Sequence, residues 1–166
     1  MKEIYERRSV RSFKRMSVEP EKQTALLKAA MAAPSAGNGQ PWEFITVENP
    51  TVLKTLSQAS PYAGCTANAP LAIVLLADKT RSKFPVCWQQ DMGAAAENIL
   101  LEAVSLELGA VWLGIAPEED RMENIRRIFN LSENYLPFCI IACGYPSEQT
   151  KPADRFDEKK IHHEHM

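Results

Sequence analysis

Residues 88–108 limit what this chain can fold into more than any other segment. The spacing of their apolar residues predicts one long helix, and apolar or small side chains occupy most of its circumference: Met92, Ala95, Ala96, Ile99, Leu100, Ala103 and Val104. A helix that is apolar on nearly all sides must be covered all round, by its own fold or by a second subunit. Gly109 is expected to cap its C-terminal end.

The segments around this helix alternate between helical and extended patterns. Residues 71–77 are continuously apolar over the length of a strand, which predicts a strand covered on both faces in the middle of a sheet. Further strands are expected at residues 44–47, 110–113 and 138–146, and further helices at residues 20–33, 50–58 and 117–129. This order predicts a mixed α/β layer fold with a sheet of about four strands.

Length and charge narrow the class of protein. A chain of 166 residues can build one hydrophobic core but is short for two, so we expect a single domain over residues 1–166. The formal charge of -2 leaves no basic field for nucleic acid or an anionic membrane. Its longest apolar runs are too short to span a bilayer, and the N-terminal segment resembles no targeting peptide. We expect a cytoplasmic protein.

Several chemistries fit the residues poorly. All three histidines lie at or beyond residue 162, so a Ser-His-Asp or Cys-His mechanism would have to take its base from the extreme C-terminus. The run at residues 162–165 lacks the spacing of four that places two metal ligands on one helical face, so we expect a solvated tail and no metal. The pair Gly37-x-Gly39 lacks the third glycine of a dinucleotide fingerprint. Sparse proton-transfer groups favour an organic cofactor.

A basic cluster near the N-terminus is a candidate phosphate site. Arg7, Arg8, Ser9 and Arg11 lie within five residues, and guanidinium groups offer forked donors to phosphate oxygens. Taken alone, these residues are more typical of a solvated basic patch or of the exposed end of a short helix. Lys151 and Arg155, late in the chain, could close on the same phosphate if the tail folds back, although isolated arginines in tails are usually solvated.

Two loops could contact a flat ring. In PSAGNGQPW, the side chains of Ser35, Asn38 and Gln40 can donate and accept hydrogen bonds, which suits the alternating groups of a flavin's pyrimidine edge. The same stretch is also typical of an ordinary helix-to-strand loop. The segment Leu113-Gly114-Ile115 ends a strand with a glycine between bulky groups that could press on a ring, or it is a sheet edge that turns a corner.

Two acidic residues of the long helix, Asp91 and Glu97, have a structural interpretation. They lie in its first half, and we interpret them as first-turn, surface or interface charges rather than as catalytic acids.

Five motifs occur in a fixed order: Arg7-Arg8-Ser9-Val10-Arg11, Pro34-Ser35-x-x-Asn38-x-Gln40-Pro41-Trp42, the apolar helix from Asp91 through Asn98, Trp112-x-Gly114, and Gly144-Tyr145-Pro146 with Arg155. Together they resemble the FMN-dependent nitroreductase family from the first helix nearly to the C-terminus. The resemblance implies an α+β fold with a central mixed sheet flanked by helices, to which a partner-chain strand could be added. It also implies an intertwined homodimer with the long helix at the subunit interface and two FMN sites built from both chains.

The same resemblance implies roles for individual residues. Arg7, Ser9 and Arg155 would grip the FMN phosphate with help from Arg8, and Arg11 would reach the N1 and O2 side of the flavin. The partner subunit would line the flavin with Pro34, Ser35, Asn38 and Gln40, and the opposite side of the ring would lie beside Leu113, Gly114 and Ile115.

The expected reaction follows from the resemblance. Hydride would pass from NADH or NADPH to flavin N5 and then to a small electron-poor acceptor, a nitroaromatic, quinone or enone, in a ping-pong cycle. No side chain need act as a nucleophile. Two alternatives stay open: dehalogenation or dehydrogenation by the same cofactor, and a non-catalytic module that binds FMN.

Overall fold

The computed structural model describes residues 2–148 and 150–166. Its longest helix, α4 (Trp88–Ser105), buries one side against the rest of the chain, through Asp91, Met92, Ala95, Ala96, Ile99, Leu100 and Ala103. The helix ends three residues before the expected position. Glu107 takes the left-handed turn conformation at φ 62°, so Gly109 is not the cap that we expected. Gly109 begins a strand instead, where a side-chain carbon would lie 2.7 Å from Val10.

Four strands form the sheet in the order β1-β2-β4-β3. They are β1 (Trp42–Val47), β2 (Leu71–Asp78), β3 (Gly109–Gly114) and β4 (Tyr135–Gly144). The expected number of strands is confirmed, as are the interior positions of the two most apolar strands. The expectation of a mixed sheet needs one correction: the four strands pair antiparallel throughout, and parallel pairing in the described chain is limited to a bridge between Ser9 and Ala110.

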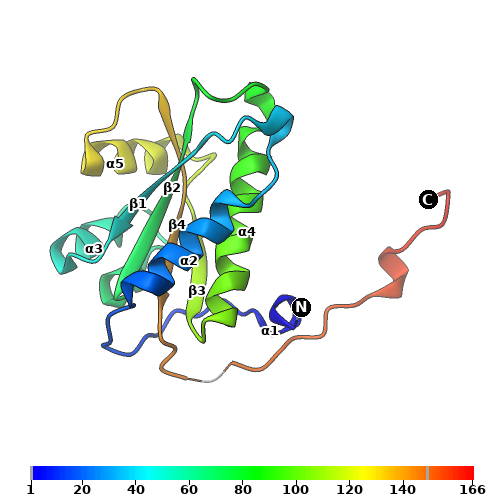
Figure 1. Cartoon of the computed structure of the whole chain (residues 1–166), viewed down its shortest axis with the longest axis horizontal. Coiled ribbons are helices and arrows are strands. Elements are labelled where there is room, and N and C mark those ends of the chain that lie inside the picture. The colour runs from blue at the N-terminus through cyan, green and yellow to red at the C-terminus, as the bar shows by residue number, and fades with distance from the viewer. Residues whose placement is uncertain (1, 149) are drawn as a thin grey trace.

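Helices cover both faces of this sheet, which confirms the α+β fold class (Figure 1). On one face α2 (Pro20–Met31) and α4 enclose a core cluster that includes Leu26, Ile99 and Ile141. The other face packs against α3 (Pro50–Leu56) and α5 (Glu119–Phe129). Because β2 contacts both clusters, its side chains from Leu71 to Ala77 are all buried, as a strand covered on both faces requires.

The N-terminal segment runs along the β3 edge of the sheet. After the short helix α1 (Glu3–Glu6), the Val10 amide donates to the Ala110 carbonyl at 3.0 Å. A second bridge joins Phe13 to Pro146, just beyond β4. These contacts fix the segment that carries the N-terminal arginines to the edge of the sheet.

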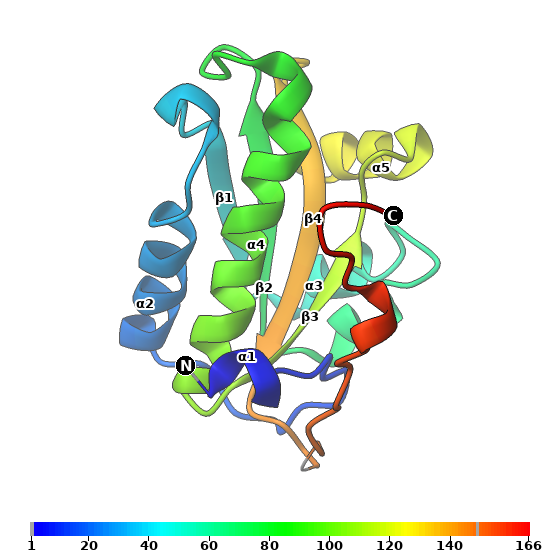
Figure 2. The ribbon, with the colours of Figure 1, turned by 90° about the vertical axis from the view of Figure 1, so that its right-hand side faces the viewer.

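The tail, residues 150–166, leaves the body of the molecule after β4. Nearly all of its residues are exposed, and Figures 1 and 2 show it extending past α1, with a single short turn, η4 (Glu158–Lys160). The hydrogen bonds within these residues are local, such as the one from the Phe156 amide to the Asp154 carboxylate at 3.1 Å. Within the described residues, no helix combines the length and the hydrophobicity needed to cross a membrane.

Candidate functional site

The N-terminal arginines and the tail arginine share one pocket. Arg7, Arg8 and Arg155 line a cavity of about 510 Å³, together with Ile4, Tyr5 and residues 152–156. The two ends of the chain therefore converge, as the phosphate hypothesis requires.

The charges in this pocket suit a phosphate monoester. Arg7 forms an ion pair with Glu97 of α4, with Nε and Oε1 3.5 Å apart. Arg8 and Arg155 have no acidic partner within the described part of the chain, so their forked donors are available to an anion. A donor set of three guanidiniums at one cavity, beside a single carboxylate, Asp154, fits the phosphate of FMN.

Ser9 and Arg11 occupy different surroundings from the paired arginines. Ser9 is exposed and pairs with Ala110 at the edge of the sheet. Arg11 lines a neighbouring cavity of about 820 Å³ with Lys14 and Arg15, rather than the pocket of Arg7 and Arg8. Arg11 also influences Cys65. Burial raises the pKa of the Cys65 thiol, and the positive charge of Arg11 partly opposes this rise.

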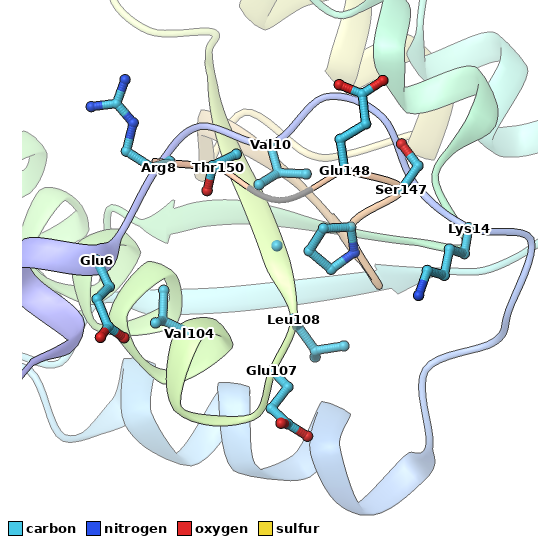
Figure 3. Close-up of a pocket in the computed structure, with 12 residues that line it drawn as sticks. Glu6, Arg8, Val10, Lys14, Val104, Glu107, Leu108, Ser147, Glu148 and Thr150 are labelled. Carbon is cyan, nitrogen blue, oxygen red and sulfur yellow. The ribbon is translucent and has the colours of Figure 1, made fainter. Parts of the chain in front are cut away.

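A further cavity lies below the N-terminal segment (Figure 3). It measures about 520 Å³ and is bordered by Glu6, Glu107 and Glu148 as well as Arg8 and Lys14. Figure 3 shows the Arg8 guanidinium pointing away from Glu107. Three carboxylates make this cavity a poor match for a phosphate, so the pocket with Arg155 is the better candidate.

The amide loop, residues 35–40, has an unusual backbone. Gly37, Asn38 and Gln40 take left-handed φ angles of 59°, 53° and 49°. Such angles are unfavourable for non-glycine residues and concentrate at ligand-binding loops, where the surrounding structure enforces them. The Ser35 hydroxyl accepts a hydrogen bond from the Gln40 amide at 3.0 Å, which closes the loop. The amide side chains of Asn38 and Gln40 are exposed and hold no hydrogen bond with any described residue.

Asp91 fixes the amide loop to α4, and the sequence analysis missed this role. Its carboxylate accepts a hydrogen bond from the Ala36 amide at 2.9 Å, and the residue is only 6% exposed. Asp91 is the first-turn acid that we expected, but its side chain is buried and holds the loop, whereas Glu97 is exposed as expected. Acidic residues are common in the first turn of a helix, so nothing in the sequence singled out Asp91. Only the fold shows that its carboxylate accepts a hydrogen bond from a loop 55 residues away.

The strand end at residues 113–115 presents a different surface from the one that the sequence suggested. Leu113 and Ile115 are buried in the cluster on the α3 and α5 face, so only their backbone could contact a ligand. Gly114, between them, is half-exposed, and a side-chain carbon added to it would meet no atom within 4 Å. The opening that we proposed for a flat ring thus lies at the glycine, and the neighbouring bulky side chains support it from within the core.

Two residues near Gly114 had no signal in the sequence. Arg121 of α5 donates through Nη1 to the Gly114 carbonyl at 3.4 Å. The same guanidinium lies 5.5 Å from the centre of the Tyr62 ring, and Tyr62 is 70% exposed. A cation and an exposed aromatic ring therefore border the candidate ring site. Neither residue belongs to a recognisable motif, because each reaches Gly114 only through the fold.

The two parts of the candidate site contact α4 at different places within one chain. The amide loop joins the first turn of α4 through Asp91, whereas Arg7 pairs with Glu97 near the middle of the helix and α1 lies beside its C-terminal half (Figures 1 and 2). Pro34, which begins the loop, is exposed. One chain therefore presents a phosphate half and a ring-edge half that face different regions of space.

Comparisons with known proteins agree with these features. The Nitroreductase family matches residues 4–64 and 59–145. A protein of Archaeoglobus fulgidus, provisionally named NADH dehydrogenase/NAD(P)H nitroreductase, is 44% identical over 99% of this chain and 97% of its own length. Among solved structures, a provisionally named NADH oxidase from Clostridium acetobutylicum is 55% identical, with a TM-score of 0.97 and 99% of each chain covered.

A second solved structure is similar over almost the whole chain. It is an FMN-dependent nitroreductase from Clostridium difficile, which is 35% identical, with a TM-score of 0.92 over 99% of this chain and 98% of that one. The family match covers most of the chain and includes both the N-terminal arginines and the amide loop. The chain belongs to the nitroreductase family.

Proposed function

We propose that two copies of this chain hold FMN between them and pass electrons from NADH or NADPH to a small electron-poor acceptor, a nitroaromatic, quinone or enone. Membership of the family makes the chain an FMN-dependent NAD(P)H oxidoreductase. The observation that carries the detailed proposal is the shared pocket of Arg7, Arg8 and Arg155, which come from opposite ends of the sequence.

The residues of this chain bind and orient the cofactor. Arg7, Arg8 and Arg155 hold the phosphate, and Ser9 adds a hydroxyl donor. Arg11 places a positive charge beside the pyrimidine ring and stabilises negative charge that develops there. When bound, FMN supplies an N5 atom that accepts hydride from NADH or NADPH and passes it to the acceptor.

The rest of the proposed ring site comes from two regions. Ser35, Asn38 and Gln40 of the partner copy present hydrogen-bonding groups to the edge of the flavin, with Pro34 beside them. Gly114 leaves room against the ring, and Leu113 and Ile115 support it through their backbone. This arrangement binds the ring on both sides without a side chain that acts as a nucleophile.

Two features support a homodimer. The phosphate half and the ring-edge half of the site contact α4 at different residues, Glu97 and Asp91, and a second copy would bring one half of each kind together. The tail carries exposed apolar side chains, Phe156 and Ile161, which gain stability if they are buried on another surface. The outer side of α4, with half-buried Ala94 and Leu101, is available for such contact.

Rapid mixing under anaerobic conditions tests the proposal. The purified protein is expected to show flavin absorbance, to lose it when mixed with NADH or NADPH, and to recover it on addition of a quinone or nitroaromatic. Flavin that neither nucleotide reduces would favour dehalogenation or dehydrogenation. Flavin that is reduced but never transfers electrons to any acceptor would favour a binding module. Protein that purifies without flavin and cannot be loaded with FMN would refute the proposal.

A further inference from the structure

A second cavity along the N-terminal segment is rich in positive charge, and we call it the basic cavity. It measures about 820 Å³ and is lined by residues 11–17 and 67–70, together with Glu48, Pro50 and Leu53. Its cations are Arg11, Lys14 and Arg15, whereas Glu48 is the one carboxylate among the described residues that line it. An excess of positive charge around a cavity raises the local concentration of anions.

The three cations of the basic cavity have no acidic partner of their own. Within residues 2–148 and 150–166, none of them forms an ion pair with a carboxylate, and all three residues are exposed. Glu48 instead accepts a hydrogen bond from Nε2 of Gln23 at 3.0 Å. Lys14 also borders the cavity shown in Figure 3, so it lies between the two cavities. The positive charge of the basic cavity is therefore available to a bound anion.

Contacts with the end of β4 hold the segment that carries these cations. The Lys14 amide donates to the Tyr145 carbonyl at 2.8 Å. Phe13 and Pro70, which line the basic cavity, both pack against Gly144, where a side-chain carbon would collide with them. The backbone around the cavity is therefore fixed by the fold, so an anion that binds there does not have to order this segment.

Arg11 connects the basic cavity to the proposed ring site. It lines the cavity, and the proposed function places its charge beside the pyrimidine ring of the flavin. A nicotinamide that gives hydride to flavin N5 lies on the flavin ring, so its diphosphate must extend past an edge of that ring. The guanidinium groups of Arg7, Arg8 and Arg155 are engaged by the FMN phosphate in the same proposal. The basic cavity is the neighbouring source of cations for a second phosphate group.

We infer that the basic cavity binds the diphosphate of NADH or NADPH through Lys14 and Arg15 while the nicotinamide lies on the flavin. The inference rests on the proposed function, because it requires the flavin beside Arg11. Quinone and nitroaromatic acceptors carry no phosphate, so Lys14 and Arg15 serve the electron donor and not the acceptor.

ADP-ribose carries the diphosphate without the nicotinamide, so it tests the site without hydride transfer. Titration calorimetry of the FMN-loaded parent should detect its binding. The double variant Lys14→Gln, Arg15→Gln should raise its Kd about five- to thirtyfold, because two exposed ion pairs are lost. The control Lys28→Gln, Arg127→Gln removes the same charge from exposed positions on α2 and α5 and should bind like the parent. No binding by the parent, or equal losses in both double variants, would overturn the inference.

Rapid mixing with three hydride donors separates donor binding from hydride transfer. The Lys14 and Arg15 double variant should need about five to thirty times more NADH or NADPH for half-maximal flavin reduction, with a limiting rate within about twofold of the parent. Reduction by 1-benzyl-1,4-dihydronicotinamide, which has no phosphate, should proceed at the parent rate. Equal slowing with this donor would overturn the inference and leave the proposed function standing. A parent whose flavin neither nucleotide reduces would remove both proposals.

Discussion

The amide loop and the tail are held in opposite ways, although both carry proposed ligands of one cofactor. The loop is fastened by its own chain: Asp91 accepts from Ala36, Ser35 accepts from Gln40, and Lys83 donates to Gly37. The tail carries Arg155, yet the hydrogen bonds among its described residues join only near neighbours in sequence. A shared pocket with α1 is the main link between the tail and the body.

This difference separates two ways of building a site. A loop held in a strained backbone conformation before the ligand arrives loses little entropy on binding, so its contacts contribute nearly their full strength. A tail without such contacts must be ordered by something else, and here the candidates are a second copy and the cofactor phosphate. The loop should therefore determine which hydrogen bonds the flavin ring receives. The tail should couple cofactor binding to the association of two subunits.

The double variant Arg7→Ala, Arg155→Ala should have the largest effect, because it removes the cations that join the two chain ends. Hydrogen bonds to charged groups contribute about 1.5 to 3 kcal/mol each, so FMN affinity should fall about 10²- to 10⁴-fold. Flavin content and FMN titration measure it. Arg127→Ala, which alters an exposed arginine of α5, is the control and should retain flavin. A double variant that purifies with a full complement of flavin would contradict the assignment.

Deletion of residues 150–166 tests whether the tail depends on a second copy. The body should keep its secondary structure, since the sheet and its two core clusters lie before residue 147. The mass in solution should fall by about half if the tail holds two subunits together. Light scattering after gel filtration measures this mass. Arg155→Ala in the full chain should weaken FMN binding without changing the mass, and a truncated chain that stays dimeric would assign the interface elsewhere.

Asp91→Ala should loosen the amide loop from α4. The substitution leaves the half-buried Ala36 amide without its acceptor, which costs about 1 to 3 kcal/mol of the free energy of unfolding. Thermal unfolding followed by circular dichroism measures the loss, and FMN affinity should fall in parallel. Asp91→Asn retains a side-chain oxygen and should restore most of both. Equal losses in the two variants would mean that the charge matters rather than the hydrogen bond.

Gly37→Ala should cost less, mainly through the backbone of the loop. A left-handed φ costs an alanine about 1 to 2 kcal/mol, which exceeds the gain of about 0.4 to 1 kcal/mol from a less flexible unfolded chain. The Phe84 ring must also shift. Gly64→Ala is the matched control, because no atom lies within 4 Å of the added carbon. Denaturant unfolding should separate the two variants, and identical stabilities would argue against strain in the loop.

The smallest expected effect concerns the contact between Tyr145 and Glu19. Tyr145, just after β4, donates to both oxygens of Glu19 at 2.9 Å and accepts from Lys22 at 2.9 Å. A hydrogen bond from its own backbone and then the one from Tyr145 lower the pKa of Glu19. The resulting stabilisation is complete above the ordinary pKa of a glutamate and is lost as the pH falls through the lowered value.

Glu19→Gln should therefore lower the melting temperature slightly at neutral pH. The difference between variant and parent should shrink as the pH falls through the acidic range, because the parent then loses the same interaction. Melting curves recorded between pH 7 and pH 3 measure this convergence. A difference that stays constant over that range would exclude the carboxylate as its source.

Much of the fold could be predicted from local sequence. The apolar run at residues 71–77 is β2 (Leu71–Asp78) in the structure. Such a strand is easy to predict, because a strand buried on both faces is apolar at every position. The arginines near residue 7 could likewise be identified from residue type and spacing, and their convergence with Arg155 followed from the resemblance. Their occupation by FMN stays a prediction.

Other features depend on contacts between distant segments and had no local signal. The C-cap of α4 is Leu106, followed by Glu107 in the left-handed conformation, because Gly109 is needed where Val10 crosses β3. The role of Asp91 depends on a loop that precedes it by 55 residues. Leu113 lies on the core face because the register of β3 against β4 decides which residues of the strand alternate inward.

The pairing of β2 with β4 has a consequence for how quickly the chain can fold. Residues 71–78 pair with residues 135–143, and α4, β3 and α5 lie between them in the sequence. The two interior strands can therefore pair only after these three elements have been synthesised. Proteins dominated by such non-local contacts fold in milliseconds to seconds rather than microseconds. During synthesis on the ribosome, β1 and β2 emerge as an antiparallel pair whose second edge stays uncovered until β4 follows. That interval is when this chain has most need of a chaperone.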